Sequence, residues 1–257
     1  MFQNIYPVFE AKRLLKKEML ENLRDYPRNL FAIQYRNYSD GILAGCDIKG
    51  TGAGLTILPG ILCHSGVPYF LDKPYSVSCA AEGKQVYLKV HFWDKTMGVS
   101  GEEFLSQIIM DEQEAVGEQE LELARFKLQP GAKLRSDYVD FYDYETEFDT
   151  VNRIHVPFAA PERPGIWPQL LKSFARELMH HNVTNPWDQA FCLSCLQLKE
   201  TMSYETVAAY LNGRRGQDRE YTNLQIYTSL KSILRETGSR EEESGQPRRK
   251  EGTLLML

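Results

Sequence analysis

Two short-spaced pairs of side chains in the last third of the chain have the residue types of metal or redox chemistry. Cys192 and Cys195 form a CxxC pair, which can bind a metal ion or cycle through a disulfide. Glu177 and His180 form an ExxH pair, half of a di-iron ligand set, but the sequence holds no second copy. His180 and His181 are adjacent and project about 100° apart on a helix, so they do not converge easily on one ion. We therefore expect core cysteines, a solvated histidine at a helix end, no metal and no cofactor.

The glycine-rich stretch GTGAGLT (50–56) is the one segment that suggests phosphate binding. A P-loop requires a lysine after its last glycine, and Leu55 follows Gly54 here. This difference excludes an ATPase or helicase motor and favours a flexible hairpin turn. The five histidines are scattered, no G-x-S-x-G is present, and His64-Ser65-Gly66 indicates another hairpin turn. Nothing in these patterns indicates an enzyme.

The run YDYETEFD (142–149) alternates acidic residues with aromatic residues or threonine. On a strand, the period of two places Asp143, Glu145, Glu147 and Asp149 on one face. Four carboxylates can collect calcium, although the EF-hand spacing is absent. The preferred interpretation is an exposed acidic edge that prevents strand addition or docks on a basic partner.

Composition limits the classes of protein that these residues can serve. The chain has 257 residues, of which 42% are hydrophobic and 25% are charged, as in ordinary globular proteins. Its net charge of -5 shows no basic excess of the kind that phosphate binding uses. No apolar run reaches the roughly 18 residues that cross a bilayer, and no signal peptide is evident, so we expect a soluble, cytoplasmic product. An odd number of cysteines, five, argues against a disulfide scaffold.

The first part of the chain predicts a short helix followed by many strands. Residues 9–25 have helical apolar spacing, and we expect this helix to stop before Pro27. Short β-rich runs with frequent turn signals then fill residues 30–94, beginning with FAIQYRNY, and a further strand and turn is expected at 121–135. Residues 102–122 hold eight acidic residues and no lysine or arginine. The helical spacing of their apolar residues Phe104, Leu105, Ile108 and Ile109 predicts a short helix, and the acids predict an exposed loop.

The second part of the chain changes to a helical period. Residues 157–168 are rich in proline and are interpreted as a linker. Four segments of helical spacing follow, with the third ending at Asn212-Gly213, and they predict a small bundle. The expected fold class is α+β: an N-terminal helix plus an antiparallel β-sandwich, followed by a small C-terminal helical bundle. The expected domains are a β-domain (1–156), the linker (157–168), a helical domain (169–236) and a disordered tail (237–257).

The order of motifs over residues 5–135 resembles a known class of structural protein. A helix precedes YRNYSDGILAGCDI, LTILPGILCHSGVPYFL with turns at Pro59-Gly60 and Ser65-Gly66, QVYLKVHF and LARFKLQPGAKLRSDYVDFYD. This order resembles baseplate and tail-fibre-attachment proteins of phage tails and related contractile particles, including the adaptor of the type VI secretion baseplate. The resemblance implies a non-enzymatic subunit, often trimeric, that assembles with other baseplate or tail subunits. With it, we assign interface roles to Pro59, Gly60, Ile61 and Tyr69, and to the acidic strand 143–149.

Two other functions remain open on the sequence. Arg214, Arg215 and Arg219 lie near Lys231 and Arg235 in the helical part, a pattern that can bind nucleic acid, although Glu220 and Glu236 interrupt it. A metal- or sugar-processing enzyme would need two carboxylates of the acidic strand to converge in a pocket. Under the first hypothesis we expect protein partners, with no membrane and no nucleic acid.

Overall fold

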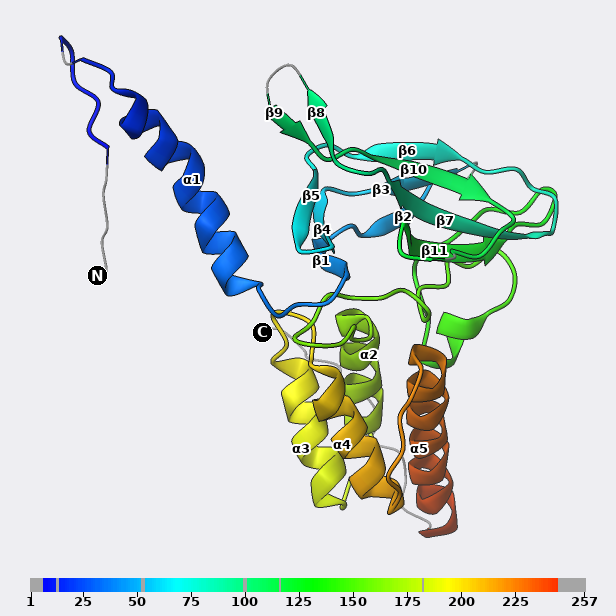
Figure 1. Ribbon diagram of the computed structural model, residues 1–257. Coiled ribbons are helices and arrows are strands. Elements are labelled where there is room, and N and C mark those ends of the chain that lie inside the picture. The colour runs from blue at the N-terminus through cyan, green and yellow to red at the C-terminus, as the bar shows by residue number, and fades with distance from the viewer. Residues whose placement is uncertain are drawn as a thin grey trace, which may run out of the picture.

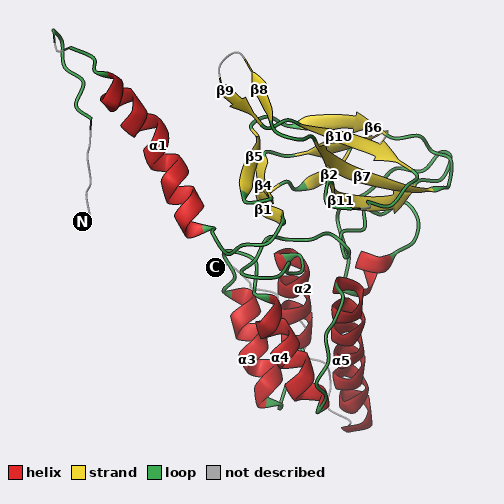
Figure 2. Cartoon of the chain, in the orientation of Figure 1, coloured by secondary structure: helices red, strands yellow, loops and turns green. Residues whose placement is uncertain are grey.

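The computed structural model describes residues 7–12, 14–51, 54–98, 101–115, 117–181 and 183–244. It contains an N-terminal helix, a β-region of antiparallel sheets and a C-terminal helical region (Figures 1 and 2). This arrangement confirms the predicted mixed α+β fold. None of the described helices combines the length and the apolar character needed to cross a membrane.

The β-region consists of short sheets that pack their apolar faces together. The sheet orders are β1-β4-β5, β2-β3-β6, β10-β7-β11 and β8-β9, and all of the pairings are antiparallel. Leu55 of β3 and Val90 of β7 belong to one cluster of buried apolar side chains that also includes Phe174 and Leu230 of the helical region. One continuous core therefore joins the two regions. The strands are β1 (Gly41–Gly45), β2 (Ile48–Gly50), β3 (Gly54–Ile57), β4 (Gly60–His64), β5 (Val67–Leu71), β6 (Tyr75–Ser78), β7 (Gln85–Phe92), β8 (Thr96–Gly98), β9 (Gly101–Glu103), β10 (Ser106–Asp111) and β11 (Glu120–Lys127).

Two predicted hairpins are present. Ser65 and Gly66 connect β4 to β5 with φ angles of 49° and 72°, the two positive values that a type I′ turn requires. β2 and β3 also pair as a hairpin, as the glycine-rich stretch predicted, although residues 52–53 at its tip lie outside the described part of the chain. The strand and turn predicted at 121–135 are confirmed by β11 and the turn that follows it.

The four predicted C-terminal helices are confirmed. They are α2 (Pro168–Met179), α3 (Pro186–Leu196), α4 (Tyr204–Arg215) and α5 (Asn223–Ser244). Asn185 and Ser203 accept backbone hydrogen bonds as the N-caps of α3 and α4. α4 ends at Gly216 with φ of 62°, so it continues past the predicted end at Asn212-Gly213.

The N-terminal helix differs from its predicted bounds. α1 spans Lys17–Gln34 and contains Pro27, so the prediction that it stops before Pro27 was wrong. It also includes the first part of FAIQYRNY, which the sequence predicted as a strand. Proline removes one hydrogen bond and disfavours a helix interior, but it does not forbid one when the apolar spacing continues beyond it. Leu30 and Ile33 continue that spacing here.

The acidic run 102–122 forms strands instead of the predicted helix. β9 and β10 lie within it, and β10 pairs with β7 from Ser106 to Asp111. The residue that stabilises these acids in a sheet is Lys89 of β7, which is 1% exposed. Its Nζ lies 3.1 Å from the carboxylates of both Asp111 and Glu120. A buried cation on the middle strand thus balances two of the acids, and local sequence could not reveal that pairing.

The proline-rich segment and the tail are both more ordered than their sequences suggested. Residues 157–168 form no helix except at Pro168, but Phe158 and Trp167 are buried, and Phe158 bridges to Ile42 and Gly165. The domain division at this segment stays a prediction. α5 extends to Ser244, which corrects the expected disorder of 237–244, while 245–257 lie outside the described residues.

Tyr227 joins the segment before α2 to α5, and its hydroxyl gives a first testable contribution to stability. The side chain is 0% exposed, its ring stacks on Phe141 at 5.0 Å, and its hydroxyl donates to the Phe141 carbonyl at 2.9 Å. Tyr227→Phe should lower the free energy of unfolding by about 1–3 kcal/mol, because a buried carbonyl loses its donor. Urea unfolding checks this, with the exposed Tyr75→Phe as the control. Equal losses for the two variants would contradict the assigned role.

Candidate protein-interaction surface

α1 carries a row of apolar side chains over which no described residue is packed. Met19, Leu23, Tyr26, Leu30 and Ile33 recur at spacings of four and three residues, the heptad pattern of a helix that packs against other helices. We call these five residues the α1 stripe. The last four are 58%, 59%, 55% and 70% exposed, and α1 has no buried residue. Figure 1 shows α1 extending away from the sheets and from the other helices.

α1 on its own has few of the features that stabilise a helix in water. Isolated helices shorter than about 12–15 residues are marginal, and Pro27 divides the 18 residues of α1 into two shorter parts. The Lys17–Glu21 ion pair, at 3.2 Å, joins exposed side chains and contributes little. Its N-cap is Lys16, which makes no side-chain capping bond. At its C-terminal end, rings of Phe31 and Tyr35 lie 4.7 Å apart, which secures that end alone. Burial of the α1 stripe against a partner is therefore the available source of stability for this helix.

α3 also exposes three large apolar side chains, Trp187 on one flank and Leu193 and Leu196 on the other. Trp187, Leu193 and Leu196 are 54%, 53% and 41% exposed, while the opposite side of α3 is buried. The Trp187 ring packs on α4 at Gly213, where a Cβ would approach the ring to 3.1 Å. The tryptophan is thus held in place at one edge and open at the other, as expected for a side chain that contacts another molecule.

The predicted interface residues of the β-region lie together on β4 and β5. Gly60 and Ile61 begin β4, after the exposed Pro59, and Tyr69 lies opposite Leu62 on β5. A Cβ at Gly60 would come within 2.3 Å of the Cys46 nitrogen, so the glycine is needed for the close approach of β1. This requirement is structural and explains the glycine of the PGI motif.

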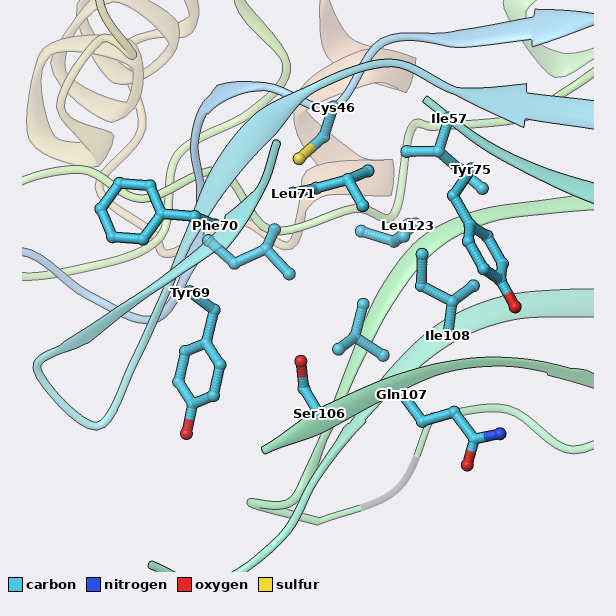
Figure 3. A pocket seen from close by; sticks show the side chains of 12 residues that line it. Cys46, Ile57, Tyr69, Phe70, Leu71, Tyr75, Ser106, Gln107, Ile108 and Leu123 are labelled. Carbon is cyan, nitrogen blue, oxygen red and sulfur yellow. The ribbon is translucent and has the colours of Figure 1, made fainter. Parts of the chain in front are cut away.

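Tyr69 also lines an apolar pocket of about 270 Å³ between the sheets. Figure 3 shows it beside Phe70 on β5, with Ser106 and Gln107 of β10 across the opening. Its ring packs on Phe92 at 4.8 Å. Tyr69 is therefore half-buried, and its role in an interface stays a prediction.

The acidic segment does not form the predicted strand. Residues 142–145 form a short 3₁₀ helix, η1 (Tyr142–Glu145), so the four carboxylates do not share one face. Each has a partner within the chain. The pairs are Asp143 with Arg135, Glu145 with Lys231 of α5, Glu147 with Lys127 at 2.5 Å, and Asp149 with the Gln129 amide at 2.9 Å. The docking role assigned to these residues stays a prediction, but it no longer rests on a row of free carboxylates.

Three of the five cations of the alternative nucleic-acid hypothesis are engaged in the same way. Arg214 lies 3.0 Å from Asp188, Arg215 lies 2.6 Å from Glu236, and Lys231 pairs with Glu145. The Arg219 and Arg235 guanidinium groups lie over the rings of Tyr221 and Tyr142. The three ion pairs reduce the positive charge that the sequence suggested, so no observation favours nucleic acid as the partner.

Of the two pairs of residues with metal or redox spacing, the cysteines lie in the core, whereas Glu177 is half-buried and His180 is exposed at the end of α2, as predicted for this histidine. Cys192 and Cys195 are free and buried, as predicted, and burial raises the pKa of the Cys192 thiol to about 12. A thiol with so high a pKa does not supply the thiolate of redox chemistry. Glu177 accepts a hydrogen bond from the Phe141 amide at 2.8 Å, and burial raises its pKa. Among the described residues, no three histidine, cysteine or acidic side chains are grouped to hold a metal ion.

No protein-family model and no curated protein sequence matches the chain. The solved structures that resemble it include two of type VI secretion baseplate proteins. A chain of the TssK-TssF-TssG baseplate subcomplex matches with a TM-score of 0.45 and 8% identity, over 91% of this chain and 100% of that chain. A crystal structure of TssK matches with a TM-score of 0.42 and 8% identity, over 90% of this chain and 71% of that chain.

Proposed function

We propose that this protein is a non-enzymatic structural subunit, an adaptor or wedge, of a phage-tail-like baseplate or related contractile particle. It is made in the cytoplasm and is then incorporated into the particle, where it acts through protein–protein interfaces. The observation that carries the proposal is the α1 stripe, an amphipathic surface on a helix that projects from the body. The motif order over residues 5–135 supports the baseplate class.

The α1 stripe fits a second and a third copy of the same helix. Heptad spacing buries the same positions of every helix around a common axis, so identical helices are mutually complementary. Full burial of a leucine or isoleucine contributes about 1.5–3 kcal/mol, and the four most exposed stripe residues are more than half exposed. Their combined burial in a trimer offsets the weakness of α1 as an isolated helix. A homo-oligomer, in the first instance a trimer, follows from the proposal.

Light scattering tests this assembly with a matched pair of variants. Leu30→Asp places a carboxylate in the α1 stripe, and Ala32→Asp places the same group on the opposite, exposed side of the same turn. We expect the unchanged protein and Ala32→Asp to have the mass of a closed oligomer at both low and high salt. Leu30→Asp should have the mass of one chain, because a buried, unpaired carboxylate costs several kcal/mol in each copy.

Two results would contradict the proposal. One is an unchanged protein that remains a single chain at high concentration, because the α1 stripe would then remain uncovered. The other is an oligomer that Leu30→Asp leaves intact, because its interface would then lie elsewhere. Far-UV circular dichroism of both variants verifies that the body of the protein remains folded.

A further inference from the structure

A second pocket, of about 440 Å³, lies where α1, β1 and the start of α2 meet. We call it the α2 pocket. Tyr35 and Tyr38, which follow α1, and Trp167, before α2, supply aromatic walls, while Lys172 and Lys199 supply ammonium groups. Neither surface described above includes it. Its lining combines apolar and charged side chains, as sites for amphipathic ligands do.

A buried guanidinium lies directly behind this pocket. Arg153 is 2% exposed, and both of its terminal nitrogens lack a hydrogen-bond partner. The guanidinium lies 4.8 Å from the centre of the Trp167 ring and 5.2 Å from that of Phe158, and both rings line the pocket. Asp47, also in the lining, is its nearest carboxylate at 3.8 Å, beyond hydrogen-bond distance. A buried charge with unsatisfied donors is costly, and its position makes the pocket favourable for an anion.

The charges of the lining itself are equal in number, and Arg153 adds one positive charge from outside the lining. Lys172 and Lys199 line the pocket together with two carboxylates, Asp47 and Glu200, whereas the Arg153 side chain is buried. Glu200 already accepts a hydrogen bond from the Tyr38 hydroxyl at 3.1 Å. Within the described part of the chain, Lys172 and Lys199 form no ion pair.

The start of α2 adds one backbone donor to this charge. Pro168 has no N–H, and the Leu170 amide donates to the Trp167 carbonyl at 3.1 Å, so Gln169 is the residue of the first turn whose amide is left to another acceptor. Trp167, Pro168 and Gln169 all line the pocket. The N-terminus of α2 thus opens onto the same space as the two lysines.

We infer that the α2 pocket binds an acidic side chain, presented next to an apolar residue, of a partner polypeptide. The carboxylate pairs with Lys172 and Lys199 at the start of α2, and the apolar neighbour packs on the aromatic walls. The two carboxylates in the lining favour a singly charged carboxylate over a doubly charged phosphate. The choice of a polypeptide ligand, but not the charge of the site, rests on the proposed interface function.

The test uses 5-fluorotryptophan, because the chain has three tryptophans and only Trp167 lines the pocket. Fluorine NMR follows the titration with acetyl-Leu-Glu-amide and with its neutral analogue acetyl-Leu-Gln-amide. From the shift of the Trp167 signal, we expect a dissociation constant for the glutamate peptide about tenfold lower than that for the glutamine peptide. One charge-assisted hydrogen bond provides a difference of this size. The Trp93 signal, outside the pocket, should not move.

Variants of the pocket complete the test. Lys172→Gln combined with Lys199→Gln should weaken binding of the glutamate peptide at least fivefold, whereas the exposed Lys133→Gln should leave it unchanged. Both lysines are partly or fully exposed, so their replacement does not threaten folding, as Arg153→Gln would. Equal binding of the two peptides, an unchanged affinity in the double variant, or displacement by equimolar inorganic phosphate would overturn the inference. The Leu30→Asp variant should still bind the peptide, so failure of α1 assembly and failure of this site are distinguishable.

Discussion

Asp188→Ala should cost about 3–5 kcal/mol of the free energy of unfolding, the range for removal of one partner of a buried ion pair. Asp188 is 2% exposed and lies on the inner side of α3. It accepts a hydrogen bond from the Tyr210 hydroxyl at 2.9 Å and lies 3.0 Å from Nε of Arg214, both on α4. Next to these contacts, the Phe191 and Tyr210 rings stack at 3.8 Å. Alanine leaves the Tyr210 hydroxyl without its acceptor and leaves the Arg214 guanidinium with Glu236, at 3.9 Å, as its remaining carboxylate.

Guanidinium unfolding measures this loss, and two comparisons make it specific. Asp218→Ala, on an exposed aspartate after α4, should change stability by less than about 0.5 kcal/mol. Asp188→Ala combined with Arg214→Met should recover part of the loss, because the uncompensated charge is removed along with its partner. A loss below about 1 kcal/mol for Asp188→Ala would show that the pair contributes little to the contact of the two helices.

Asp143→Ala should cost about 2–4 kcal/mol near neutral pH, because one carboxylate organises the segment between β11 and η1. It accepts hydrogen bonds from Arg135 at 2.6 Å, from the Val139 amide at 2.9 Å and from the Thr146 hydroxyl at 2.7 Å. Glu147→Ala provides the control within the same acidic segment, residues 142–149. Its carboxylate is 62% exposed and pairs with Lys127, and exposed pairs contribute about 0–1 kcal/mol.

The pH dependence of the Asp143 contribution has a defined sign. The Arg135 guanidinium, ahead of the Val139 and Thr146 hydrogen bonds, holds the pKa of Asp143 well below its usual range. A depressed pKa in the folded state means that the stabilisation is complete above the unfolded value, near pH 4, and declines as the pH falls below it. Urea midpoints of the unchanged protein and of Asp143→Ala should therefore differ most near pH 7 and converge toward pH 2. A difference that stays constant over this range would contradict the assignment.

The sequence predicted those elements whose signals are local. The helices α2, α3 and α5 follow from apolar residues at a period near 3.6, and the β4–β5 hairpin follows from Ser65-Gly66, because few residue pairs tolerate two positive φ angles. The buried cysteines and the α+β class were also predictable. The α1 stripe was not predictable, because Pro27 indicated the end of the helix and the residues after it were not assigned to α1.

The acidic segments show what local patterns leave open. Alternation alone could not distinguish β10 from a helix, or η1 from a strand, because the deciding partners are distant in sequence. Lys89 balances Asp111 across β7, Arg135 holds Asp143, and Lys231 of α5 pairs with Glu145. Each acid could be listed from the sequence, but its cation could not be assigned.

The sequence by itself determined the fold class, the helical half of the molecule, the hairpins and the buried thiols, because these depend on side-chain periodicity and backbone preferences over a few residues. The tertiary structure alone decided which charges remain free and which apolar surfaces remain uncovered. In the folded chain, Asp143 of the acidic segment and Arg214 of the arginine patch have partners of opposite charge. The α1 stripe remains exposed, and Arg153 lies behind the α2 pocket. Charge pairing and burial depend on contacts between residues far apart in the chain, and only the folded arrangement specifies those contacts.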